Sequence, residues 1–212
     1  MLDIHAPGHP VFGIRDFFIH LLTITAGLLI ALGLEAGVEA MHHRHQRIEA
    51  DANLRSELGD NIKELAKVQA TVPKEEAAIE KLLQLAEDRT QHKQIDIPPT
   101  QLGFDFATLH HAAWGTASAT GVLNYMDYSQ VQRFAEAYEM QIEFVNIQDQ
   151  TLQSYLDLQS HIRPQLRKLD LASMSPQDLA NSITNLRHTL VHLIAMQQVA
   201  DALRKDYDKA IQ

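Results

Sequence analysis

The chain has 212 residues, of which 45% are hydrophobic and 21% are charged, so it is neither disordered nor wholly embedded in lipid. Lysine and arginine total 18 against 27 aspartates and glutamates. The resulting formal charge of -9 argues against a nucleic-acid binder, whose phosphate contacts need a basic surface. There are no cysteines, which excludes disulfide bonds, thiolate metal sites and cysteine nucleophiles.

The strongest signal in the sequence is an apolar run of 18 residues, from Phe17 to Leu34, that contains no Asp, Glu, Lys or Arg. As an α-helix this run is about 27 Å long, close to the hydrocarbon thickness of a bilayer, which is about 30 Å. We therefore predict an N-terminal tail over 1–16, a transmembrane anchor over 17–40 and an extramembrane body over 41–212. A buried core helix is the alternative for a run of this length.

A cleaved signal peptide is a further alternative for the same run. Arg15 precedes the run, and Val38 and Ala40 fit the small-residue rule for a cleavage site. The run is longer than a usual signal core, however, and Glu35 and Glu39 would lie in the cleavage region. We favour a signal anchor that is retained in the mature protein.

The charges that flank the span give a weak indication of orientation. One basic residue, Arg15, precedes the span, and Arg44 and Arg47 follow it, which favours a cytoplasmic body by the positive-inside rule. Long domains, however, cross the membrane largely regardless of charge, and a tail of 16 residues is typically the part that stays behind. We therefore favour a bacterial inner-membrane protein with a periplasmic body.

The predicted span carries small and polar residues at helical spacing, together with a small-xxx-small pair. Small residues let two helices approach closely in lipid, and a polar stripe that faces acyl chains is costly. We predict a helix contact, with a second copy or with a subunit of a membrane complex, through His20, Thr23, Gly27, Ala31, Gly33, Glu35 and Gly37. The alternative is that glycine and threonine are simply common in membrane helices.

The body is predicted to be all-α. Apolar residues recur every three or four positions from Ile48 to Val72, which predicts a helix that continues from the span as a stalk and ends at Pro73. A second helix is predicted over 74–89, with acidic residues in its first turn. A connection follows over 91–105, where consecutive prolines lack backbone donors.

Two further long helices complete the body. One is predicted from Ser129 to about Ile162, with an apolar stripe that includes Val131, Phe134, Tyr138, Ile142, Val145, Leu152 and Leu156. The other begins at Ser175, which caps the helix, and Pro176 takes the first helical position. The prediction is an antiparallel bundle of about four long helices on a membrane stalk.

Histidines cluster at two places where a shared metal ion must be considered. His188 and His192 lie one helical turn apart, but no third ligand is near them in sequence, and they are predicted to lie on the surface. His42 and His43 follow the span, where Glu39 can approach His43 at four-residue spacing, and this group is more typical of an interfacial belt. We therefore predict no metal site and no cofactor, and keep these four histidines as weak candidates.

Aromatic residues gather among glycine, alanine, serine and threonine between Phe104 and Tyr128. Large rings beside small residues can line a pocket, or they can let helices pack closely at an irregular corner. The candidate ligand or partner site in this segment consists of Phe106, His110, His111, Trp114 and Tyr125. Ordinary packing is the alternative.

No phosphate-binding glycine loop, nucleophile elbow, kinase motif set or paired-carboxylate motif appears, so we predict no enzymatic activity. The leading hypothesis is a membrane-anchored protein that acts through association, as an accessory subunit of a larger membrane complex or as a self-associating scaffold. Its partners would be the lipid bilayer and such a complex or its own copies, and not nucleic acid. The alternatives are a sensory or small-ligand-binding bundle with a site near Trp114, and metal handling by the histidine clusters.

The layout of the chain resembles that of a known group of proteins. Arg15-Asp16-Phe17-Phe18 leads into an apolar span that ends near Glu35, and a helical stalk follows. Trp114 then precedes a run of small residues and a long helix that carries Tyr138 and Phe144. In these features the sequence is similar to a widespread group of uncharacterised bacterial single-pass membrane proteins with an N-terminal anchor and a helical body. The resemblance implies a bacterial inner-membrane anchor, but no activity and no site residue.

Overall fold

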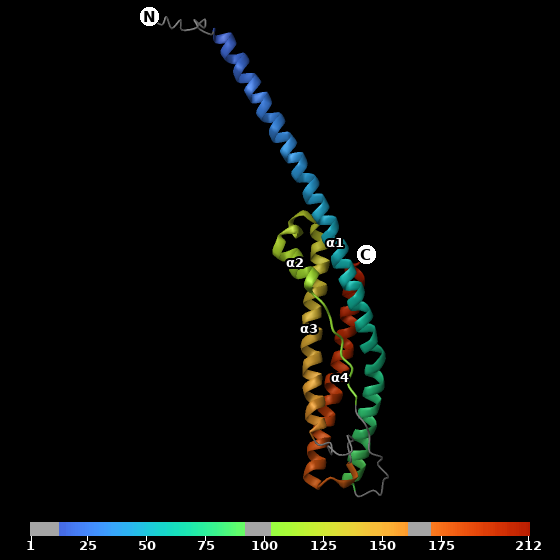
Figure 1. Cartoon of the computed structure of the whole chain (residues 1–212). Helices are drawn as coiled ribbons and strands as arrows, with labels where there is room; N and C mark the ends of the chain where they lie inside the picture. Colours follow the sequence, from blue (N-terminus) through green and yellow to red (C-terminus); the bar gives the residue numbers. More distant parts are fainter. Residues whose placement is uncertain (1–12, 92–102, 161–170) are drawn as a thin grey trace, which may run out of the picture. The chain divides into compact units, whose positions relative to one another are not determined.

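A computed structural model describes residues 13–91, 103–160 and 171–212. The described residues contain no strand, which confirms the all-α class (Figure 1). They form four α-helices and two short 3-10 helices, which are α1 (Ile14–Thr90), α2 (Ala112–Thr120), η1 (Val122–Tyr125), α3 (Tyr128–Gln159), η2 (Leu171–Ser173) and α4 (Pro176–Ala210). The chain divides into two compact units, Met1–Ile48 and Glu49–Gln212, and α1 contributes residues to both.

The described part of the first unit is a helix with an apolar surface. Every side chain from Gly13 to His42 is exposed, including those of fourteen large apolar residues. The hydroxyls of Thr23 and Thr25 donate to the carbonyls of Ile19 and Leu21 at 2.9 and 2.8 Å, so neither leaves a polar group unpaired. The helix is long and apolar enough to cross a membrane.

The predicted end of the first helix at Pro73 is wrong, because α1 continues through this residue to Thr90. A proline inside a helix removes one backbone donor and clashes with the preceding turn, at a cost of about 3 kcal/mol. Large side chains on both sides of Pro73, such as Val72 and Ile79, are almost wholly buried in the same core. Burial of each such side chain contributes roughly 1.5–3 kcal/mol, and together they outweigh the cost of the proline.

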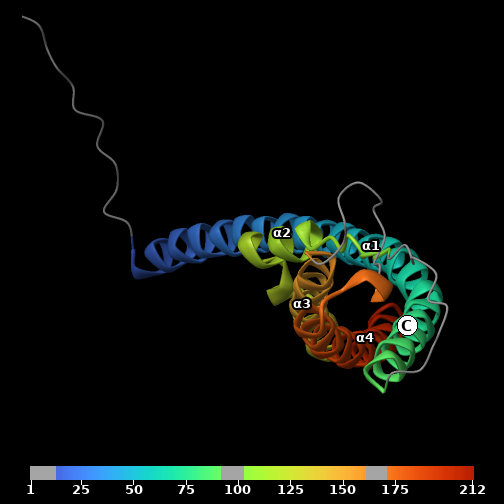
Figure 2. The same cartoon turned by 90° about the horizontal axis from the view of Figure 1, so that it is seen from below.

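The second unit is a bundle of the later part of α1 with α3 and α4, which Figure 2 shows from below. The closest pair of helices is α3 and α4. Arg187 near the start of α4 pairs with Glu87 near the end of α1 at 2.7 Å, whereas Ile211 after the end of α4 contacts Arg55. Thus α4 runs antiparallel to α1 and α3, while α1 and α3 run parallel to each other (Figure 1).

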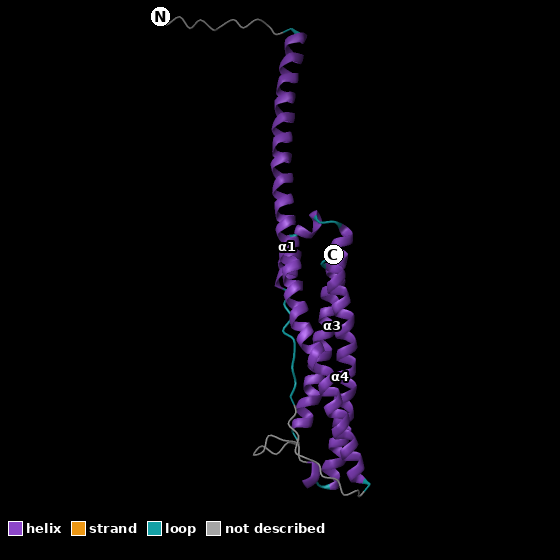
Figure 3. Ribbon diagram, turned by 90° about the vertical axis from the view of Figure 1, so that its right-hand side faces the viewer, coloured by secondary structure: helices purple, strands orange, loops and turns teal. Residues whose placement is uncertain are grey.

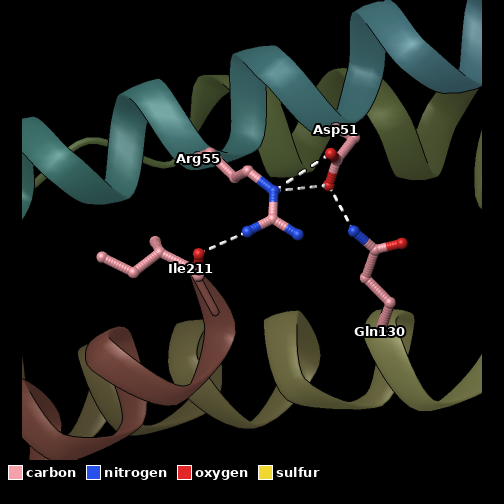
Figure 4. Close-up of polar contacts among 4 residues, drawn as sticks. All are labelled: Asp51, Arg55, Gln130 and Ile211. Atoms are coloured by element: carbon pink, nitrogen blue, oxygen red, sulfur yellow. Dashed lines mark hydrogen bonds and ion pairs between the residues drawn. The ribbon is translucent and has the colours of Figure 1, made fainter.

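A polar cluster joins all three long helices at the end of α4 (Figure 4). Arg55 donates from Nε to both carboxylate oxygens of Asp51 at 3.0 Å, and from Nη1 to the carbonyl of Ile211. Gln130 on α3 donates to the same carboxylate of Asp51. Because the last carbonyls of a helix have no partner within it and carry partial negative charge, the guanidinium at Ile211 stabilises the end of α4.

The apolar stripe predicted for α3 is correct in part. Phe134 and Tyr138 are buried, but Ile142 and Leu156, predicted in the same stripe, are exposed. Polar side chains occupy part of the buried face instead, and those on all helices together are Asn61, Gln141, Gln148, Thr151, Ser182 and Thr189. The three amides, Asn61, Gln141 and Gln148, are buried because an extended segment packs against α1 and α3 and bonds to them.

Candidate functional site

Residues 103–111, called the return segment below, are not helical, and they carry the chain back along α1 and α3 (Figure 3). Ala107 is bonded to Gln148 of α3, whereas His110 is bonded to Gln141, which lies two turns earlier on the same helix. His110 is also bonded to Asn61 of α1. The return segment therefore lies between α1 and α3 and runs antiparallel to α3.

Asn61 is wholly buried, and its side-chain amide pairs with the backbone of His110 in both directions. Its Oδ1 accepts the His110 N–H at 2.8 Å, and its Nδ2 donates to the His110 carbonyl at 2.7 Å. The second proton of Nδ2 is directed to Oε1 of Gln141 at 3.1 Å, an atom that also accepts from the Tyr207 hydroxyl at 2.7 Å. One buried network thus joins α1, α3, α4 and the return segment.

Gln148 repeats this pairing at Ala107. Its Oε1 accepts the Ala107 N–H at 2.8 Å, and its Nε2 donates to the Ala107 carbonyl at 3.2 Å. Gln141 and Gln148 are two helical turns apart, about 10.5 Å, and three extended residues from Ala107 to His110 span about 10 Å. The spacing of the two glutamines on α3 matches the spacing of Ala107 and His110. Amide side chains on α1 and α3 thus supply the hydrogen bonds that an extended segment would otherwise find in a sheet.

Glu57 of α1 holds the start of α2. Its carboxylate accepts the Ala113 N–H at 2.9 Å and the Tyr138 hydroxyl at 2.6 Å, and a negative charge is favourable at a helix N-terminus. Burial, followed by the hydrogen bond to Glu57, raises the pKa of Tyr138, so the phenol acts as a donor. The Tyr138 ring stacks on Trp114, with centroids 5.3 Å apart, and so covers one face of the indole.

A groove of about 450 Å³, called the Trp114 groove below, lies beside this stacked pair. One wall comes from the end of the return segment and from α2, with Leu109, His111 and Trp114. The other wall is α3, where Ile142 and Val145 supply apolar surface, and Glu139 and Asn146 are the exposed polar groups.

Two of the five residues in the predicted aromatic site, His111 and Trp114, line this groove, and the other three do not. Phe106 and Tyr125 are exposed elsewhere, and His110 takes part in the buried network through its backbone. The groove residues on α3 and the buried amides Asn61, Gln141 and Gln148 were not predicted. The sequence did contain one signal for these buried amides. Each of the three lies on the same helix face as apolar residues one turn before and after it.

A partly buried carboxylate lies next to the beginning of the return segment. Burial, followed by the charge of Asp105, raises the pKa of Glu75 to about 7, against a backbone hydrogen bond from Asp105 that lowers it. Within the described chain, Oε2 of Glu75 is buried and has no hydrogen-bond partner. Burial also raises the pKa of the Tyr155 hydroxyl, with Glu75 as the second cause.

The residues predicted for the membrane-helix contact are all exposed in the first unit. A Cβ added at Gly27, Gly33 or Gly37 would meet nothing within 4 Å, so a partner helix has room to approach closely. At 3.6 residues per turn, His20, Thr23, Gly27, Ala31 and Glu35 lie on one side of the helix, and Gly33 and Gly37 lie on another. The seven predicted residues therefore form two faces.

Two of the four histidine candidates, His43 and His192, have polar partners within the chain. Nε2 of His43 lies 3.3 Å from Glu39, which confirms the predicted approach of these two side chains. His188 is exposed, whereas His192 is half-buried with its Nδ1 2.6 Å from the hydroxyl of Ser154. Across residues 13–91, 103–160 and 171–212, no group of three or more His, Asp or Glu side chains could hold a metal ion.

No family model, no curated protein and no solved structure matches this chain. Its function must therefore be inferred from its own residues and geometry.

Proposed function

We propose that this chain is a single-pass membrane protein without catalytic activity that works by association, as an accessory subunit of a larger membrane complex or as a self-associating scaffold. One observation carries the proposal: every side chain from Gly13 to His42 is exposed on a helix that is long enough to cross a bilayer. Each large apolar side chain gains roughly 1.5–3 kcal/mol when it leaves water. A lipid environment supplies that gain, and a second helical unit on the same chain is then free to bind partners.

The proposed location is a bacterial inner membrane, with the second unit in the periplasm. Long domains cross the membrane largely regardless of their charge, so Arg44 and Arg47 after the span do not oppose this orientation. The resemblance in layout to bacterial single-pass proteins supports the choice of membrane. Protease digestion of intact spheroplasts tests the orientation, because a periplasmic body is digested from outside and a cytoplasmic one is protected.

Anchoring is tested on the native chain. We expect the protein to stay with the membrane fraction after alkaline carbonate washing, because the apolar helix spans the bilayer. We also expect the measured mass of the mature protein to equal that of a chain that has not been cleaved after Ala40. Release by carbonate would contradict a membrane span. A mass equal to that of a chain that begins after Ala40 would show a cleaved signal peptide.

Association is tested by gentle solubilisation of native membranes, followed by native-gel sizing and mass spectrometry of the co-migrating proteins. Reproducible migration with a larger defined assembly supports the accessory-subunit form of the proposal. A homo-oligomer supports the scaffold form. Migration as a monomer, alone, would contradict both.

The two faces of the membrane helix give a matched pair of variants. Gly27→Leu combined with Ala31→Leu is expected to weaken helix pairing by about 1 kcal/mol, because the larger side chains keep the two backbones apart. Gly33→Leu combined with Gly37→Leu tests the second predicted face in the same way. Oligomer or complex fractions on native gels measure the effect. Equal fractions for both double variants and the wild type would exclude the face that contains Gly27.

A further inference from the structure

We infer that the Trp114 groove binds the apolar face of a basic amphipathic helix from a partner protein. The inference rests on the proposed function and names the chemistry of the partner. The groove residues on α3 extend from Ala135 to Asn146, about three turns or 16 Å of one helix face. A helix laid into such a groove presents apolar side chains at i, i+3 or i+4, and i+7, which repeat at the same interval.

The α3 wall contains an apolar side chain that the other described residues leave mostly exposed. Ile142 is 62% exposed even though it lies in the groove between Tyr138 and Val145. The ring of Trp114 is held by its stack on Tyr138, and Trp114 lines the opposite wall. An aromatic ring that is fixed before binding loses little conformational entropy on contact, which is typical of interface residues with large effects on affinity.

The charge of the groove indicates a basic partner. Glu139 lies in the wall and is exposed, and Glu143, one turn further along α3, is also exposed. Among the described residues that line the groove there is no lysine or arginine. Carboxylates one turn apart match lysines or arginines that repeat one turn apart on a helix, whereas a small ligand with a single charge would use only one of them.

The test uses the full chain in a neutral maltoside detergent, and Trp114 is the reporter because it is the single tryptophan of the protein. The probe is a synthetic helical peptide of about four turns, with leucine on one face and lysine on the other. We expect a saturable shift of Trp114 emission to shorter wavelength as leucines cover the indole. Replacing every lysine of the peptide with glutamate should weaken binding about tenfold or more.

Two variants with matched controls locate the binding. Ile142→Ser and Glu139→Lys should each weaken binding of the basic peptide about tenfold, because they remove the exposed apolar contact and reverse the charge of the wall. Val191→Ser and Asp157→Lys should leave it unchanged, since neither residue lines the groove. Val191 is 62% exposed, as is Ile142, so the serine variants remove apolar surface of equal exposure. Circular dichroism checks that all four variants keep their helices.

Several results would overturn the inference. The basic and acidic peptides could bind with equal affinity, or the groove and control variants could change the affinity for the basic peptide equally. Trp114 emission could also show no saturable change. Tighter binding of tetraphenylphosphonium than of the peptide would show a site for small lipophilic cations instead. If the peptide fails while the native chain still migrates with a larger assembly, only this inference is lost. If the native chain migrates as a monomer, the proposed function is lost.

Discussion

Asn61→Ala is expected to lower the free energy of unfolding by about 3 kcal/mol, because it removes a wholly buried amide and leaves the part-buried N–H of His110 without this partner. The substitution also removes a donor from the His110 carbonyl and from Oε1 of Gln141. Urea unfolding of the full chain in detergent, followed by Trp114 fluorescence and by circular dichroism, measures the change.

Asn53→Ala is the control for this prediction. Asn53 is an exposed asparagine on the same helix, so its substitution should change stability by less than about 0.5 kcal/mol. Both variants gain the same helix propensity from alanine, and the difference between them isolates the buried hydrogen bonds. A difference below about 1 kcal/mol would contradict a stabilising role for the amide network.

Stability should also fall as the pH rises from about 4.5 to about 7, and Glu75→Gln should remove much of this dependence. The pKa of Glu75 is raised from 4.5 to about 7, first by burial and then by Asp105. Across this window the folded chain holds the proton more tightly than the unfolded chain, so stability that is full below pH 4.5 is lost by pH 7. Allowing for partial exposure to solvent, the loss is roughly 2 kcal/mol.

Urea unfolding at pH 5 and pH 8 measures this loss in the wild type and in Glu75→Gln. Burial also raises the pKa of Glu76, which lowers stability over the same direction of pH change. The variant is therefore expected to keep some pH dependence, and the test is its difference from the wild type. Glu49→Gln, at an exposed position of α1, should keep the wild-type dependence. An equal fall in stability for Glu75→Gln and Glu49→Gln would show that Glu75 is not responsible.

The parts of the fold that depend on local sequence could be predicted. The start of α4 is an example, since the helix begins at Pro176 and the Ser175 hydroxyl accepts the Asp178 N–H at 3.2 Å, as the capping pattern indicates. Helix type and length follow from apolar periodicity in the same way. Pro73 shows the limit of a local rule, because buried residues on both sides of it override its preference.

The buried amides could not be predicted, because they depend on a segment distant in sequence. Gln141 and Gln148 look like solvent-facing positions until the return segment is placed against them, and its backbone then requires donors and acceptors. With these amides turned inward, the buried face of α3 rotates away from Ile142, which becomes exposed. The groove has the same origin. The aromatic residues around Trp114 predicted a site there. The α3 wall of the groove could not be predicted, because it depends on how α3 lies beside Trp114.

The parallel arrangement of α1 and α3 has a consequence for the order of folding. The hydrogen bonds of α1 to α3 join residues 79 to 81 positions apart, such as Asn61 with Gln141 and Glu57 with Tyr138. The pair Ser154 and His192, between α3 and α4, is only 38 positions apart. Because closing a longer loop costs more entropy, we expect the α3–α4 hairpin to form first and α1 to dock later. During synthesis α1 is made before every helix that covers its apolar face, so the ribosome must complete α4 before the core can close.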